Sequence, residues 1–95
     1  MAITLTAERR SAVGKQVRQL RAEGRLPGNV YGGSLKEPVP IQLDLKETEK
    51  LIRASGKGGD YELNLDGKTL PVKIEEVQRE PLRKGFVHVD FVVKG

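Results

Sequence analysis

The chain has no cysteine, no tryptophan and a single histidine among its 95 residues. Without cysteine it forms no disulfide and has no thiolate for catalysis or metal binding. One histidine and scattered carboxylates do not supply the three or four ligands of a transition-metal site. Aromatic residues amount to 4% of the chain, so Val, Leu and Ile must form most of the core. We therefore expect neither a metal nor a cofactor.

Long apolar runs are also missing. No stretch approaches the roughly 18–20 apolar residues that a transmembrane helix needs, and the N-terminal MAITLTAERR does not resemble a signal peptide. These features predict a cytoplasmic protein without membrane contact. The length predicts one domain over residues 1–95 with a single modest core.

Positive charge is in excess, with 17 Lys and Arg residues against 13 Asp and Glu residues and a net charge of +4. This balance favours an anionic partner such as nucleic acid. A basic domain without any such partner has the same composition, so charge alone leaves both interpretations open.

Alternation of apolar and polar residues predicts strands over residues 3–8 (ITLTAE) and 38–44 (PVPIQLD). Between them, residues 29–31 are predicted as a short extended segment that follows a Pro27-Gly28 turn. Further along, Asp66-Gly67 separates two alternating runs within residues 60–78. This pattern predicts a hairpin with a type I′ turn. Its register pairs Leu63 with Leu70 and Tyr61 with Val72.

Two short helices are expected. Residues 15–24 (KQVRQLRAEG) place Val17 and Leu20 three residues apart and end at a glycine suited to a helix C-terminus. The second helix begins after Asp44, which with Glu47 resembles a capping box, and ends at Gly56.

The final run, residues 86–94 (FVHVDFVVK), alternates as a strand. One face carries only apolar residues, so the core side is complete without the two polar residues. Period two places His88 and Asp90 together on the other face, roughly 7 Å apart. The apolar face consists of Val87, Val89, Phe91 and Val93, and the other face of Phe86, His88, Asp90 and Val92.

The sequence thus predicts five or six strands and two short helices. Two helices are too few to cover both faces of so large a sheet. We therefore predict a mainly β protein with short helices (α+β), in which a small, strongly curved sheet or closed barrel carries helical attachments.

Catalytic motifs are not recognisable. Ser11, Ser34 and Ser55 do not lie in a nucleophile elbow, and the glycine-rich GKGG and YGG lack the spacing of phosphate-binding loops. We expect a protein that is not an enzyme and takes no small-molecule substrate.

RNA binding fits the remaining features. Cations gather within seventeen residues and would contact phosphates, while polar groups on a rigid strand would read base edges in a wide, shallow RNA groove. A solvated basic face and an ordinary His–Asp surface pair are the simpler alternatives. The cations are Arg9, Arg10, Lys15, Arg18, Arg21 and Arg25, and the polar candidates are Tyr31, Gln78, Arg79, His88 and Asp90.

The segments GKQVRQLRAEGRLPGNVYGG, VQREP and HVDF, in this order, resemble the family of bacterial large-subunit ribosomal protein twenty-five, to which the general stress protein CTC is related. The resemblance spans nearly the whole chain and implies a small six-stranded β-barrel with two or three short helices. It also implies binding to loop E of 5S ribosomal RNA in the central protuberance of the large subunit, among rRNA and other ribosomal proteins. The residues carried over are Arg9 or Arg10, Lys15, Arg18, Arg21, Tyr31, Gln78, Arg79, His88 and Asp90.

Departures from the family pattern leave alternatives open. Glu80 follows Gln78-Arg79 where a basic or neutral residue is expected, and the adjacent Arg9 and Arg10 compete for one family position. Longer family members carry a second domain. A basic barrel that binds an acidic protein, or an RNA-binding module for tRNA, remains the alternative function.

Overall fold

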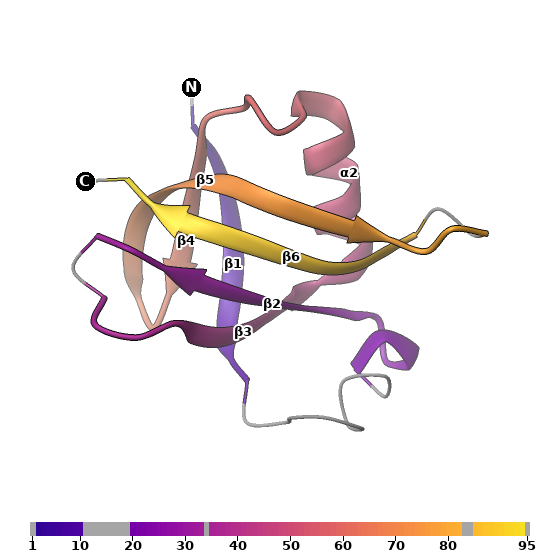
Figure 1. Ribbon diagram of the computed structural model, residues 1–95, viewed down its shortest axis with the longest axis horizontal. Helices are drawn as coiled ribbons and strands as arrows, with labels where there is room; N and C mark the ends of the chain where they lie inside the picture. Colours follow the sequence, from indigo (N-terminus) through magenta and orange to yellow (C-terminus); the bar gives the residue numbers. More distant parts are fainter. Residues whose placement is uncertain (1, 11–19, 34, 83–84, 95) are drawn as a thin grey trace.

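The computed structural model describes residues 2–10, 20–33, 35–82 and 85–94, and its six strands close into a barrel (Figure 1). The order around the barrel is β1-β3-β2-β6-β5-β4. Pairs β1–β4 and β2–β6 are parallel, and the other four are antiparallel. The predicted mainly β fold, a six-stranded barrel, is confirmed. Its strands are β1 Ile3–Arg9, β2 Arg25–Tyr31, β3 Val39–Asp44, β4 Tyr61–Leu65, β5 Lys68–Arg79 and β6 Phe86–Val93.

The core fills the barrel with aliphatic side chains and three aromatic rings. Inward residues alternate with outward ones along β1, β3 and β4, as the period-two pattern predicted. In β1, for example, Leu5 and Ala7 are buried while Thr4 and Thr6 are exposed. The largest fully buried side chains include Tyr61, Phe86, Phe91, Leu26, Ile41, Leu43 and Leu63.

The β4–β5 hairpin has the predicted turn and register. Asp66 and Gly67 have φ angles of 55° and 78°, which a type I′ turn requires. Leu63 pairs with Leu70 and Tyr61 pairs with Val72. The local signal was sufficient because both the turn residues and the cross-strand pairs specify the same register.

Helix α2, Leu45–Ser55, packs at one end of the barrel, on the right in Figure 1. Its N-terminus is capped as predicted, because the Glu47 N–H donates to Asp44 Oδ1 at 2.9 Å. Gly56 ends the helix with φ 70° and donates its N–H to the Ile52 carbonyl at 2.6 Å. Ile52 and Thr48 form the buried side of the helix.

The predicted first helix falls largely outside the described residues, and so does Val17. Leu20–Ala22 is helical, and Leu20 is buried. Gly24 has φ 83° and donates its N–H to the Arg21 carbonyl at 3.0 Å. This end of the helix agrees with the prediction that Gly24 terminates it.

The predicted Pro27-Gly28 turn is wrong, because both residues lie inside β2 and are buried. Pairing of β2 with β6 begins at Gly28, so Pro27 has a ladder partner on the β3 side alone and its missing N–H is tolerated. Gly28 is needed for close packing rather than for a turn. A Cβ there would lie 2.3 Å from the Val89 carbonyl oxygen.

The predicted orientation of Phe86 is also wrong. Alternation placed Phe86 outward with His88, yet Phe86 is fully buried. The reason is a bulge in the β5–β6 ladder, where Gln78 pairs with His88 and the next residue, Arg79, pairs with Phe86. Val87 is the extra residue, and because of it Phe86, which precedes it, projects to the opposite side from the one that simple alternation predicts.

Among the described residues, no helix has the length and apolar character to cross a membrane. The same residues contain no group of three or more His, Asp or Glu side chains placed to hold a metal ion.

Candidate nucleic-acid interface

His88 and Asp90 project together from the outer face of β6, as predicted. Val89 between them is fully buried, so the strand holds the two polar side chains on a rigid support. His88 Nδ1 lies 3.4 Å from Asp90 Oδ1, and the side chains are 24% and 22% exposed. The geometry at Nδ1 makes no hydrogen bond. The pair therefore becomes an ion pair when the ring is protonated.

Asn29 of β2 joins this pair. The parallel ladder sets Asn29 directly opposite Asp90. Its side-chain nitrogen lies 3.4 Å from Asp90 Oδ1 and 3.4 Å from His88 Nε2. The amide N–H groups thus donate to both side chains, and Nε2 accepts when Nδ1 carries the ring proton.

Arg10 completes the arrangement from the end of β1. Its guanidinium donates to the Ile41 carbonyl at 3.2 Å, to the Gly28 carbonyl at 3.3 Å and to Asn29 Oδ1 at 3.5 Å. The contact with Oδ1 orients the amide so that its nitrogen faces β6. We call the set Arg10, Asn29, His88 and Asp90 the polar row.

Gln78 and Tyr31 flank the polar row. Gln78 is exposed and pairs with His88 across the β5–β6 ladder. Tyr31 follows Asn29 by two residues and therefore lies on the same face of β2. Desolvation raises the pKa of Tyr31 above its ordinary value of 10.0, and the charges of Glu75, Asp90 and Glu76 raise it further. At neutral pH the phenol keeps its proton and can donate a hydrogen bond.

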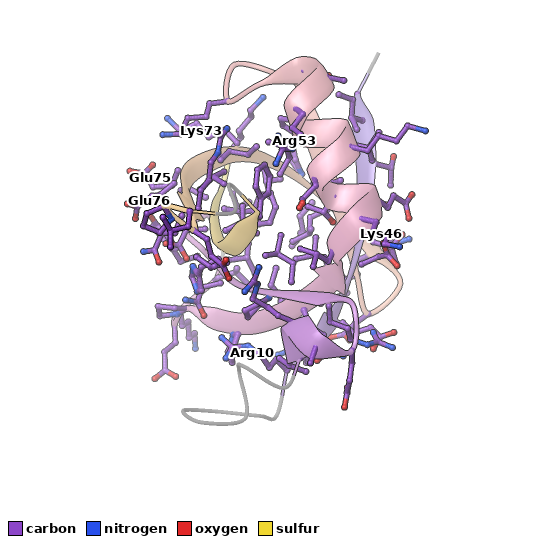
Figure 2. All side chains as sticks on the ribbon, turned by 90° about the vertical axis from the view of Figure 1, so that its right-hand side faces the viewer. Arg10, Lys46, Arg53, Lys73, Glu75 and Glu76 are labelled. Atoms are coloured by element: carbon purple, nitrogen blue, oxygen red, sulfur yellow. The ribbon has the colours of Figure 1, made fainter. Side chains whose placement is uncertain are left out.

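The carboxylates near Tyr31 come from a second bulge. Ile74 pairs with Phe91, whereas Glu76 pairs with the adjacent Asp90, so Glu75 is the extra residue. Both Glu75 and Glu76 are consequently exposed side by side. Figure 2 shows them on the barrel wall away from α2. The outer face therefore carries acidic acceptors next to its donors.

Arg9 and Arg10 point in different directions. Arg9 Nε forms an ion pair with Asp66 Oδ2 at 2.5 Å, at the end of the barrel with the β4–β5 turn. Both of these side chains are exposed, at 62% and 50%. Of the two candidates for one family position, Arg10 is connected to His88 and Asp90 through the side chain of Asn29, whereas Arg9 pairs with Asp66.

Arg21 makes contacts within the protein. Its Nε donates to the Phe86 carbonyl at 3.0 Å, and Nη1 contacts Glu80 Oε1 at 2.5 Å. Both side chains of the ion pair are 27% exposed. Glu80, which departs from the expected pattern, is thus the partner that ties Arg21 to the segment before β6.

Arg79 is separated from Gln78, although the two are adjacent in sequence. Consecutive strand residues face opposite sides. The Arg79 guanidinium carbon lies 5.3 Å from the centroid of the Phe86 ring, at the α2 end of the barrel. Lys15 and Arg18 lie outside the described residues. The structure therefore brings Arg10, Tyr31, Gln78, His88 and Asp90 to one face and places Arg9, Arg21 and Arg79 elsewhere.

Comparison with known proteins decides the family. The model of the Ribosomal L25p family matches residues 5–91, which include β2 to β5 and most of β1 and β6. The chain belongs to the ribosomal L25p family. The proteins of this family are structural components of ribosomes and not enzymes.

Relatives of this L25p protein fall into two length classes. A large ribosomal subunit protein bL25 of Pectobacterium atrosepticum is 40% identical over 94 residues, which is 95% of this chain and 97% of the relative. The bL25 of Listeria monocytogenes is 38% identical over 93 residues, covering 97% of this chain and 44% of the relative. That of Thermomicrobium roseum is 37% identical over 87 residues, 92% of this chain and 39% of its own length. The chain thus spans less than half of these longer relatives.

Asn29 is the member of the polar row that the sequence analysis did not identify. It was assigned to the extended segment 29–31, where period two already places Asn29 and Tyr31 on the same side. A polar residue between buried Gly28 and Val30 was the available signal. Its partners were not visible in the sequence, because they depend on the parallel pairing with β6.

Proposed function

We propose that this chain is a structural protein of the large ribosomal subunit that binds 5S rRNA at loop E, in the central protuberance of the cytoplasmic ribosome. Membership of the ribosomal L25p family and the names of the relatives support the assignment to the large subunit. Residues 1–95 act as one RNA-binding domain, with rRNA and neighbouring ribosomal proteins as partners.

The observation that carries the proposal is the polar row across three strands of a closed barrel. Its donors and acceptors hold one another at 3.4–3.5 Å, so their directions are defined before RNA arrives. Preformed groups of this kind suit the wide, shallow groove of an RNA stem, where base edges and 2′-hydroxyls are accessible.

Asp90 contributes selectivity rather than attraction. A carboxylate repels phosphates, so it is favourable at an RNA surface only where it accepts from an amino group or a hydroxyl. His88 and Gln78 supply adjacent polar groups, and Tyr31 supplies a neutral phenol for hydrogen bonding or stacking.

Cations outside the polar row supply the phosphate contacts in this proposal. Arg9 stands exposed at the end of β1, and Lys15 and Arg18 follow it in sequence. Such contacts provide affinity without sequence information and weaken as salt increases. Arg21 has a different role in this proposal. Its bonds to the Phe86 carbonyl and to Glu80 hold the chain at Arg21 against the barrel.

A binding titration against 5S rRNA tests the function, with a loop E mutant and a tRNA as controls over a range of salt. We expect tight binding to 5S rRNA that the loop E mutation abolishes. Equal, weak and steeply salt-dependent binding to all three RNAs would contradict the proposal. Preference for tRNA, or for an acidic protein with no RNA protection, would instead support the corresponding alternative.

A further inference from the structure

A cationic cleft lies between α2 and the end of β5, away from the polar row. Its volume is about 490 Å³, and it is lined by Ile52, Arg53, Gly56, Lys57, Val77 and Arg79. The charged members from both walls, Arg53, Lys57 and Arg79, are all cations. The other lining residues, Ile52, Gly56 and Val77, carry no charge.

Two of these cations are held on one aromatic ring. The guanidinium carbons of Arg53 and Arg79 each lie 5.3 Å from the centroid of Phe86, which is fully buried beneath them. Contact with the ring holds both guanidinium groups at this end of the barrel. Guanidinium groups suit phosphate oxygens, to which they can donate two hydrogen bonds at once.

Further cations extend the cleft along α2. Lys46, Lys50 and Arg53 follow one another at spacings of four and three residues, so consecutive members are neighbours about 5–6 Å apart. All three are exposed, as is Lys57 just beyond the helix. Figure 2 labels Lys46 and Arg53 near the two ends of α2. Glu47 projects to one flank of this row, whereas Glu49 lies four residues before Arg53 at the edge of the row and is half-buried.

We propose that the cleft and the α2 cations, Lys46, Lys50, Arg53, Lys57 and Arg79, form a second RNA-binding surface that contacts the phosphate backbone of an RNA segment other than loop E. Three of these cations, Lys46, Lys50 and Arg53, follow one another along α2 at spacings of four and three residues. This repetition favours a polyanionic backbone over an isolated acidic side chain of a protein. The choice of RNA as occupant rests on the proposed function, since RNA is the abundant polyanion in a ribosome.

Charge-matched variants test the surface. Lys50→Gln with Lys57→Gln removes two cations that do not contact Phe86, so the barrel should keep its stability. Lys36→Gln with Lys68→Gln removes two exposed cations near the β4–β5 turn, at the opposite end of β5, and serves as the control. Both are compared with the unchanged chain in binding an RNA duplex of arbitrary sequence, which contains no loop E.

We expect the α2 variant to bind the duplex on the order of tenfold more weakly at low salt, with a salt slope smaller by about 1.4–1.8 units. The control variant should retain most of the affinity and slope. Equal losses in the two variants would overturn the proposal, because net charge would then explain binding. Polyglutamate that displaces the duplex at lower concentration than RNA does would also overturn it, in favour of an acidic protein.

The absence of cysteine permits a test in assembled subunits. Ala54→Cys introduces a unique thiol on the exposed side of α2, to which an iron probe for RNA cleavage can be attached. We expect cuts in an RNA segment outside loop E. Cuts confined to loop E, or cuts in no RNA, would overturn the second surface. Failure of the proposed function would appear separately, as equal affinity for 5S rRNA and its loop E mutant.

Discussion

Asn29 and His88 lie on parallel neighbouring strands with Nδ2 and Nε2 3.4 Å apart, and this contact assigns the histidine a tautomer. Because Arg10 donates to Asn29 Oδ1, the amide nitrogen faces β6 and donates to the ring. Nε2 then accepts, and the proton of the neutral ring resides on Nδ1, 3.4 Å from Asp90 Oδ1. One amide of β2 thereby orients both polar residues of β6.

Replacing Asn29 should therefore release His88. We predict that Asn29→Ala lowers the free energy of unfolding by about 1 kcal/mol, through loss of weak hydrogen bonds, and shifts the neutral ring toward the Nε2–H tautomer. Nitrogen NMR shifts report the tautomer without ambiguity, since the chain has one histidine. The same substitution at Asn64 of β4, which does not adjoin β6, is the control. An unchanged tautomer in Asn29→Ala would contradict the proposed network.

Arg10 and Arg9 should differ in stability and in recognition. Arg10→Ala removes charged hydrogen bonds to two backbone carbonyls and should cost about 1.5–3 kcal/mol. Arg9→Ala removes an exposed ion pair and should cost less than about 1 kcal/mol. Urea unfolding measures both. In RNA titrations, Arg10→Ala should reduce discrimination against a loop E mutant, while Arg9→Ala should mainly flatten the salt dependence. The reverse ranking would place Arg9 at the recognition face.

Gly28 should resist substitution because β2 and β6 approach closely there. The Cβ of Gly28→Ala would overlap the Val89 carbonyl and contact its side chain, which should destabilise the barrel by about 1–3 kcal/mol. Gly58→Ala is the matched control, since a Cβ there meets nothing within 4 Å. The urea midpoints of unfolding measure the stability of the two variants, and that of Gly28→Ala should be the lower. Equal stability would mean that the strands can separate at Gly28 without cost.

These examples show which parts of the fold were predictable from sequence. The β4–β5 register and the α2 cap follow from neighbouring residues, because turn chemistry and capping act over a few positions. The outward position of His88 and Asp90 likewise follows from period two. In contrast, the Val87 bulge that turns Phe86 inward arises from pairing with β5 and leaves no local signal.

The candidate site likewise combines features that follow from the local sequence pattern with features that depend on contacts between distant parts of the chain. Strand alternation was enough to place His88 and Asp90 on the outer face of their strand. The separation of Arg9 from Arg10, and of Arg79 from Gln78, depends on how the barrel ends. The internal partners of Arg21, Glu80 and Phe86, were not visible in the sequence because they lie about sixty residues away, and the predicted phosphate contact of Arg21 stays a prediction.

Alkaline pH should destabilise the fold through its two tyrosines. Desolvation raises the pKa of both Tyr31 and Tyr61 above 10.0, while a hydrogen bond from Ser55 partly lowers that of Tyr61. A folded-state pKa above the unfolded value means that the stabilisation is complete below about pH 10 and is lost as pH rises through the folded pKa. Unfolding free energies measured from pH 8 upward should show this decline.

Tyrosine titration separates the two residues. Glu75→Gln should move the pKa of Tyr31 toward 10.0, because a negative charge beside the phenol is removed. The pKa of Tyr61, which is shifted by burial, should stay the same. A shift of Tyr61 alone would contradict the placement of Glu75 beside Tyr31.

The central claim is that the outer face of β6 selects the RNA while cations elsewhere hold it. The most direct measurement compares Asp90→Ala with Lys15→Ala, each titrated against 5S rRNA and a loop E mutant across salt concentrations. Asp90→Ala should reduce the affinity ratio between the two RNAs more than it reduces bulk RNA affinity. Lys15→Ala should preserve the ratio and flatten the salt slope by about 0.7–1 unit. Equal losses on both RNAs for both variants would contradict the claim.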